Sequence, residues 1–400
     1  MLMGYIEKFL LLITGLFAAV QFANAQTWAP TSAPDTNWVS VASSADGIKL
    51  VAAAYGGISF QGNRGTVMPG PIYTSTNSGL TWQETTAPTE IWRSVASSSD
   101  GIKLVAVSLE GIYTSTNAGT TWMPSTNAPI HVFWSAIASS ADGSELIAAP
   151  GGGSIYISTD NGTTWLPTPT DPHQHWSFAA CSADGKKLLA APQSGWISYS
   201  TNSGATWAQA GAPDYEWQAV AVSSDGSTFI AAARYDFVVA DDGGPIYVST
   251  NSGESWFQSG APIAPWLAVA SSADGKRLLA SVYRGGIYTS PDSGMTWVAN
   301  RAPSQNWTSV TSSEDGTKLV AVVNGGEIYI PMLGIALSSD EIVLSWPTNS
   351  INFTLQQNLC LSATNWVDMT NPPNVNLTTF QYELTVPLTN DCGFYRLKAP

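Results

Sequence analysis

The sequence predicts an all-β protein: a seven-bladed β-propeller closed by an N-terminal strand, followed by a small C-terminal β-sandwich-like module. Two repeated features predict this fold. An Asp-Gly pair lies eight residues after each of seven tryptophans, whose spacings are 54, 42, 42, 41, 49 and 41 residues. A period of about 40 residues, divided into four short strands, is typical of a propeller blade. The seven tryptophans are Trp38, Trp92, Trp134, Trp176, Trp217, Trp266 and Trp307.

The repeat that begins at Trp92 illustrates the four strands. Short apolar and β-branched runs at 92–97, 103–107, 111–115 and 121–124 predict strands. The first two are joined by an Asp-Gly pair, which supplies the positive φ angles of a tight hairpin. An Asn-x-Gly turn joins the last two.

That second turn motif occurs in six repeats. It begins with Asn or Asp, whose side chain hydrogen-bonds the backbone amides of the turn, and a Gly two residues later permits a positive φ angle. A tryptophan then opens the next strand. We therefore assign a structural role to six residues: Asn77, Asn117, Asp160, Asn202, Asn251 and Asp292.

The motif, seen in 111–122 as GIYTSTNAGTTW, resembles the Asp-box (BNR) repeat of sialidase-like β-propellers. The resemblance implies that these turns, with the Asp-Gly turns, lie on the face opposite the binding or active site. It does not extend to sialidase chemistry, because no Arg-Ile-Pro-like motif is present. Related xyloglucan-degrading hydrolases usually pair two propellers, whereas this chain has one. The similar photosystem II assembly factor depends on a basic patch that this acidic chain lacks.

The two ends of the repeat region predict how the ring closes. The seventh repeat lacks its fourth strand, because Pro331 follows the third strand in place of the turn motif. Trp28 lies ten residues before Trp38, the spacing between the fourth strand of one repeat and the first strand of the next. We therefore expect the strand at 27–30 to complete the last blade, so that residues 26–331 form seven blades.

Residues 332–400 carry no repeat. Short apolar runs separated by Asn, Pro and Ser predict a small β module. A domain of this size gains stability from a disulfide, and we expect Cys360 and Cys392 to pair. The third cysteine, Cys181, replaces a serine of the sister repeats and is expected to be a small buried residue.

The N-terminus and the charge balance bear on location and partners. Residues 1–25 read as an export signal, since Lys8 precedes the apolar run 9–20 and Ala23-Asn24-Ala25 has the form of a cleavage site. We expect a secreted, periplasmic or cell-surface protein with no transmembrane segment after signal cleavage. The net charge of −14 argues against a nucleic-acid partner. We expect no cofactor and a monomer.

Function on a repeat scaffold is expected where the repeats differ. Two loops between second and third strands are enlarged, at 60–71 and 234–245, and the links between blades carry all three histidines. These loops are expected to form a binding rim on the face opposite the turns. Its candidate residues are Arg64, His131, His173, His175, Tyr215, Arg234 and Tyr235.

The same region contains candidates for catalysis. Glu216 with Asp236 or Asp241 could supply the carboxylate pair of a glycoside hydrolase, whose separation is roughly 5 to 9.5 Å. His173, His175 and Glu216 are of the types that bind zinc, but a polar solvated loop also accounts for them, and no metal is assigned. The seven tryptophans either pack between blades or line the channel mouth, where they would stack on sugar rings.

The predicted function is non-enzymatic binding of an extracellular polysaccharide or a protein partner through the rim loops. Near-identical repeats favour this function, because catalysis needs a distinctive, asymmetric set of polar groups. The alternative is a glycoside hydrolase that uses carboxylates of the fourth and fifth blades. A structural role at the cell surface, with the C-terminal module as an anchor or sorting signal, is a third hypothesis.

Overall fold

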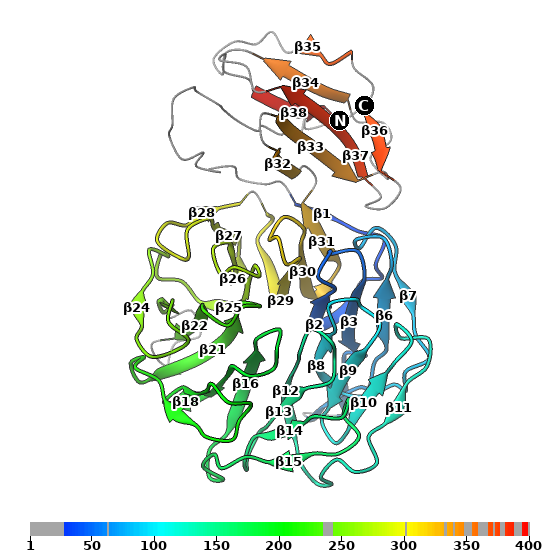
Figure 1. Ribbon diagram of the computed structural model, residues 1–400. Helices are drawn as coiled ribbons and strands as arrows, with labels where there is room; N and C mark the ends of the chain where they lie inside the picture. Colours follow the sequence, from blue (N-terminus) through cyan, green and yellow to red (C-terminus); the bar gives the residue numbers. More distant parts are fainter. Residues whose placement is uncertain are drawn as a thin grey trace. The chain divides into compact units, whose positions relative to one another are not determined.

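The protein is all-β in the residues that its computed structural model describes (Figure 1). No helix in this part of the chain is long and apolar enough to cross a membrane. The chain divides into two compact units, one formed by Pro30–Trp297 and Pro303–Ile330 and the other including Pro331–Pro400. The predicted signal at 1–25 lies outside the described residues. These are 28–61, 64–234, 243–300, 302–331, 334–338, 341–347, 354–358, 367–370, 373–376, 381–387 and 394–398.

The first three repeats contain β2 (Thr36–Ser43), β3 (Leu50–Tyr55), β6 (Ile72–Ser75) and β7 (Gln83–Glu84); β8 (Trp92–Ser97), β9 (Leu104–Ser108), β10 (Ile112–Ser115) and β11 (Met123–Pro124); and β12 (Trp134–Ser139), β13 (Leu146–Pro150), β14 (Tyr156–Ser158) and β15 (Leu166–Pro167). The insertion in the first repeat contains a hairpin, β4 (Ile58–Gln61) and β5 (Arg64–Val67).

The fourth and fifth repeats contain β16 (Trp176–Cys181), β17 (Leu188–Pro192), β18 (Ser194–Gly195), β19 (Ser198–Ser200) and β20 (Ala208–Gln209); and β21 (Tyr215–Val222), β22 (Phe229–Arg234), β23 (Ile246–Ser249) and β24 (Phe257–Gln258). The last two contain β25 (Trp266–Ser271), β26 (Leu278–Gly285), β27 (Ile287–Ser290) and β28 (Val298–Ala299); and β29 (Gln305–Ser312), β30 (Leu319–Gly326) and β31 (Ile328–Pro331), which pairs with β1 (Trp28–Pro30).

Each repeat pairs its strands antiparallel in chain order. In the second repeat the order is β8, β9, β10, β11, as predicted. The register between the first two strands shifts by one residue just after the tryptophan, between Trp92 and Ser94, and all seven repeats share this irregularity. A bulge of this kind bends the strand and increases its twist, which suits an innermost strand where sheets converge.

The tryptophans that begin the repeats belong to the core. Trp92 is 1% exposed, donates its indole N–H to the carbonyl of Gly70 at 2.8 Å, and meets the Tyr113 ring edge-on at 5.3 Å. The other six are buried to a similar degree, at 0 to 2% exposure. They therefore pack between sheets and do not present rings to a sugar at the channel mouth.

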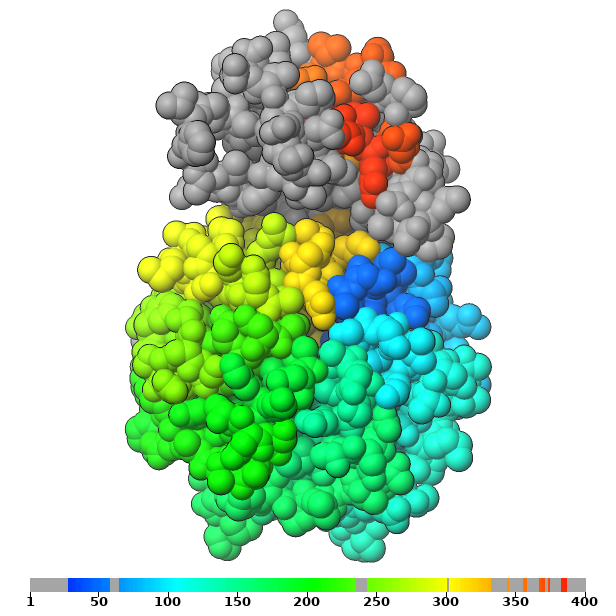
Figure 2. Space-filling view, viewed as in Figure 1, coloured from blue at the N-terminus to red at the C-terminus, as the bar shows by residue number. Residues whose placement is uncertain are grey.

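Hydrogen bonds connect the seven Asp-Gly turns in a cycle. Each bond runs from a backbone amide of one turn to a backbone carbonyl of the next, over 2.7 to 3.2 Å. Strand β2 also pairs with β30, and Figure 2 shows the blue start of the repeat region beside its amber end. The amides and their acceptors are Ala45 to Ser99, Ser99 to Ala141, Ala141 to Ala183, Ala183 to Ser224, Asp225 to Ala273, Ala273 to Glu314 and Glu314 to Ala45.

The C-terminal part contains two antiparallel sheets. One has the order β32 (Gly334–Ser338), β33 (Glu341–Pro347), β37 (Gln381–Pro387), β36 (Asn374–Asn376), and the other β35 (Val367–Asp368), β34 (Thr354–Asn358), β38 (Phe394–Lys398). Leu344 and Leu384 of the first sheet and Leu355 of the second are buried. The predicted disulfide between Cys360 and Cys392 falls outside the described residues.

Candidate functional site

The side chains of the Asn/Asp-x-Gly motif are used inside their own turns. After β6, Asn77 Oδ1 accepts the amide of Thr81 at 2.9 Å, and Ser75 Oγ accepts the amide of Gly79 at 3.0 Å. The Trp82 indole closes the turn by donating to the Gly79 carbonyl at 2.9 Å. The same amide-to-Oδ1 bond forms at Asn117, Asp160, Asn202, Asn251 and Asp292.

The Asp-Gly turns are stabilised by their aspartates in the same way. In the third repeat, Asp142 Oδ1 accepts the amide of Ser144 at 2.9 Å and the hydroxyl of Ser140 at 2.7 Å. These bonds, led by the one from the amide, hold the pKa of Asp142 at about 2. At Asp46, Asp225, Asp274 and Asp315 burial raises the pKa, but hydrogen bonds and nearby cations together outweigh it, so the pKa is lowered. At Asp100 and Asp184 the hydrogen bond from the serine hydroxyl is the largest cause, and the pKa is lowered there as well.

A cationic side chain links several of these turns to the next repeat. Lys103 Nζ donates to the carbonyl of Asp142 at 2.8 Å, and Lys49, Arg277 and Lys318 make the equivalent contact at the same distance. In the third repeat this position holds Glu145, which lies beside Gly185 of the next turn. A carboxylate cannot donate to a carbonyl, so this contact is missing between the third and fourth repeats.

We expect Glu145→Lys to raise the free energy of unfolding by about 0.5 kcal/mol, the range of a partly exposed charged hydrogen bond. The new ammonium group would donate to the Asp184 carbonyl, as Lys103 does to Asp142. Urea unfolding measures the change. The reciprocal variant, Lys103→Glu, should lose a similar amount, and a stability gain in both variants would contradict this explanation.

The loops on the opposite face run between second and third strands and between successive repeats. Five of them are joined in chain order by four contacts: the Gly151 amide donates to the Phe133 carbonyl at 2.7 Å, and His175 Nδ1 contacts the Gly151 carbonyl. The Gln193 amide donates to the His175 carbonyl at 3.2 Å, and the Trp217 amide donates to the Gln193 carbonyl at 3.1 Å. These bonds place 130–133, 151–153, 173–175, 193–196 and 215–216 in one continuous surface, called here the rim ledge.

The rim ledge contains four of the predicted rim residues. His131, His173 and His175 are exposed, and Tyr215 is half-buried. It also contains large apolar side chains that sequence reasoning did not select: Ile130 is 77% exposed, Phe133 60% and Trp196 45%. Their loop positions were visible in the sequence, but exposure of an apolar side chain depends on which neighbours cover it.

The carboxylate candidates are placed only in part. Glu216 in β21 lies opposite Arg234 in β22 and opposite Ser194 in β18. A Glu and an Arg directly opposite one another on adjacent antiparallel strands form a favourable charge pair. The residues proposed to complete the hydrolase pair, Asp236 and Asp241, fall outside the described residues, as does Tyr235.

The histidines of the rim ledge do not form a metal site with Glu216. In the described part of the chain, no three His, Cys, Asp or Glu side chains form a group that could hold a metal ion, so His173, His175 and Glu216 do not make the considered zinc set. Arg64 begins β5 in the inserted hairpin of the first repeat, opposite Gln61. Phe60, another insertion residue, lies opposite Gly65.

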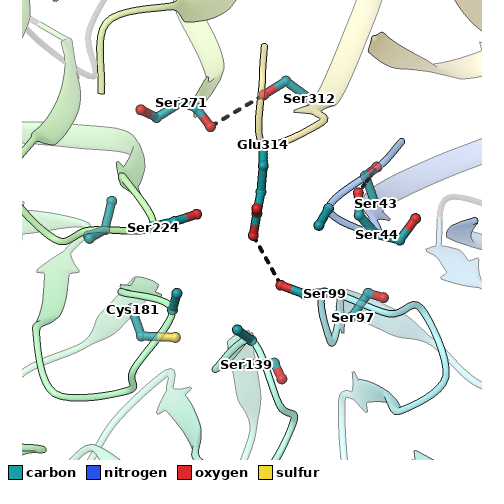
Figure 3. Close-up of a pocket in the computed structure, with 14 residues that line it drawn as sticks. Ser43, Ser44, Ser97, Ser99, Ser139, Cys181, Ser224, Ser271, Ser312 and Glu314 are labelled. Atoms are coloured by element: carbon teal, nitrogen blue, oxygen red, sulfur yellow. Dashed lines mark hydrogen bonds between the residues drawn. The ribbon is translucent and has the colours of Figure 1, made fainter. Parts of the chain in front are cut away.

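A pocket of about 150 Å³ opens at the other end of the channel, among the Asp-Gly turns (Figure 3). Residues from all seven repeats line it, and most of them are serine or alanine. Glu314 extends across it and accepts the Ser99 hydroxyl at 3.1 Å. Sequence reasoning missed this site because the resemblance pointed to the other face.

Cys181 also lines the pocket. The sequence predicts a small buried residue here, whereas Cys181 is half-buried. Desolvation of its thiol, with the nearby carboxylates of Glu145 and Asp184, raises its pKa to about 12. The thiol is therefore protonated at neutral pH, which makes it a poor nucleophile.

Comparisons with known proteins support the fold. No family model matches the chain, and no curated protein matches it. These comparisons give no support for the sialidase-type family that the turn motif resembles.

Solved structures do match. "YCF48 bound to D1 peptide" has a TM-score of 0.56 at 15% identity, covering 77% of this chain and 97% of that one. YCF48 from Cyanidioschyzon merolae has 0.57 at 14%, covering 76% and 98%. Hydrazine synthase of Kuenenia stuttgartiensis has 0.56 at 14%, covering 76% and 97%. At this identity the likeness concerns the fold alone, and the fold of this chain is that of a β-propeller.

Proposed function

We propose that this chain is a secreted, seven-bladed propeller that binds an extended segment of a partner protein on its rim ledge. The blade count is supported by the seven repeats and by the hydrogen-bond cycle that returns from Glu314 to Ala45. Pairing of β1 with β31 supports closure of the last blade by the N-terminal strand. The signal-like segment at 1–25 supports secretion.

The observation that carries the binding proposal is the exposure of Ile130, Phe133 and Trp196 on loops of the rim ledge. Exposed aromatic side chains are among the residues that most often dominate the energetics of protein interfaces. The tryptophans of the core are buried and contribute nothing to this surface. Binding would therefore depend on a few loop residues rather than on the repeated scaffold.

The chemistry of the ledge favours a protein partner. The ledge combines its apolar side chains with three histidines and a glycine-rich loop at 151–153, and the exposed backbone of Gly152 can hydrogen-bond an extended peptide. The net charge of −14 favours a neutral or basic segment over an acidic one. One solved neighbour is described as bound to a peptide, in keeping with this use of the fold.

The test uses the mature chain from Gln26, screened in parallel against a random peptide library and a glycan array, with sugar release recorded. The double variant Phe133→Ala/Trp196→Ala should weaken the binding of the selected peptide at least tenfold, which is a loss of about 1.4 kcal/mol in binding free energy. Its matched control is Met123→Ala/Leu166→Ala, which removes apolar side chains that are at least as exposed, from the outer strands β11 and β15. The control should bind like the parent.

Other outcomes would overturn the proposal in distinguishable ways. Glycan binding without peptide binding would make the partner a polysaccharide. Sugar release that is lost in Glu216→Gln would make the protein a glycoside hydrolase. Equal loss of peptide binding in both double variants would place the binding surface away from the rim ledge.

A further inference from the structure

The pocket among the Asp-Gly turns is lined by one charged side chain, that of Glu314. The residue just before Asp-Gly is Glu314 in the seventh repeat and serine or alanine in the other six: Ala45, Ser99, Ala141, Ala183, Ser224 and Ala273. Glu314 is the one ionisable acid among the residues that line the pocket, beside the protonated thiol of Cys181. A single carboxylate has therefore been added to an otherwise uncharged ring.

The hydroxyl groups of that ring are turned so that their oxygens can accept hydrogen bonds. Ser43 Oγ donates to the carbonyl of Ser44 at 2.8 Å, and Ser97, Ser139 and Ser271 donate to the carbonyl of the following residue in the same way. A hydroxyl has one proton, so each of these oxygens is left with lone pairs only. Ser312 donates to Ser271, and Ser99 donates to Glu314.

Most backbone amides of the turns around the pocket are also already used. The amides of Ala45, Ser99, Ala141, Ala183 and Glu314 all donate within the hydrogen-bond cycle of the turns. The pocket therefore offers many acceptors, few donors and one negative charge. An anion would meet few donors and one like charge there, whereas a cation that carries its own donors would meet mostly acceptors.

From this arrangement we propose that the pocket binds one hydrated divalent cation of the Mg²⁺ type, held by Glu314 and, through its water molecules, by the ring of serine oxygens. Mg²⁺ has six octahedral positions, gives up its water reluctantly and is commonly held by one or two carboxylates. With Glu314 in one position, five waters remain. A pocket of about 150 Å³ has room for several water molecules.

The same geometry disfavours other cations. Ca²⁺ takes six to eight oxygen ligands and needs several of them from protein at direct distance. Zn²⁺ is bound directly by a tight group of three or four His, Cys or carboxylate side chains, and the described residues contain no group of three such side chains. Water-mediated binding needs no such group, because each bound water donates its two protons to acceptors farther away.

The experiment uses Mn²⁺, an octahedral stand-in for Mg²⁺, whose free EPR signal disappears on binding. The mature chain should bind one Mn²⁺ with a dissociation constant of up to about 1 mM, and Mg²⁺ should displace it. Glu314→Gln and Glu314→Ser should each weaken this binding at least tenfold. The serine variant recreates the residue found at Ser99 and Ser224, and its melting temperature reports that the fold is intact.

Glu145→Gln is the matched control, because Glu145 lies on the same face but does not line the pocket. It should bind Mn²⁺ like the parent. The proposal is overturned by absence of a one-to-one site, by equal weakening in Glu145→Gln and Glu314→Gln, or by displacement with methylammonium as effective as with Mg²⁺. The last result would show a pocket for small cations in general.

Discussion

Trp92→Ala is expected to lower the free energy of unfolding by about 3 to 5 kcal/mol, the cost of emptying a large buried aromatic site. The side chain is 1% exposed and packs in a cluster with Val51, Ile72 and Leu104. Its removal also leaves the Gly70 carbonyl without the indole donor. Urea denaturation measures the loss, and the circular dichroism of the folded protein shows whether the repeat structure survives.

Trp196→Ala is the matched control, since this tryptophan is 45% exposed in a loop. Its truncation should change the unfolding free energy by no more than about 0.5 kcal/mol. The two variants remove the same kind of side chain, one from a buried site with a hydrogen-bond partner and one from an exposed loop. Similar losses in both would contradict the view that the repeated tryptophans form the core and the loop tryptophan serves the surface.

Acid is expected to destabilise the propeller between about pH 4 and pH 2. The pKa of each Asp-Gly aspartate is lower in the folded protein than its ordinary value of 3.8, and that of Asp142 is about 2. A carboxylate with a lowered folded pKa stabilises the fold at pH values above the unfolded pKa. That contribution disappears as the pH falls through the folded pKa, because protonation removes the acceptor charge. Thermal unfolding at stepped pH should show a progressive fall of Tm in this window.

Asp142→Asn tests the cause. An amide oxygen can still accept the amide of Ser144, as asparagine does in the other turn motif at Asn77, but it does not titrate. The variant should take up about one proton fewer on unfolding near pH 3, and its Tm should depend less steeply on pH. A pH dependence identical to that of the parent would show that the Asp-Gly carboxylates are not responsible.

Most of the repeat architecture could be predicted from the sequence because its signals are local. In the second repeat the expected strands 92–97, 103–107, 111–115 and 121–124 agree with β8 to β11 within about two residues. Turn chemistry sets these positions: Asp-Gly and Asn-x-Gly specify where the chain reverses, whatever the sheets pack against. The rim candidates at 173–175 and 215–216 could likewise be located, because they lie where the repeats differ.

The sites themselves required the tertiary structure. Exposure of Phe133 and Trp196 depends on which loops of neighbouring repeats lie over them, and identical residue types are buried elsewhere. Glu314 and Ser99 are 215 residues apart, and they meet because the repeats turn around a common axis. The order of strands and turns was thus determined by local sequence, whereas the contents of the channel pocket were decided by convergence of seven distant turns on one point.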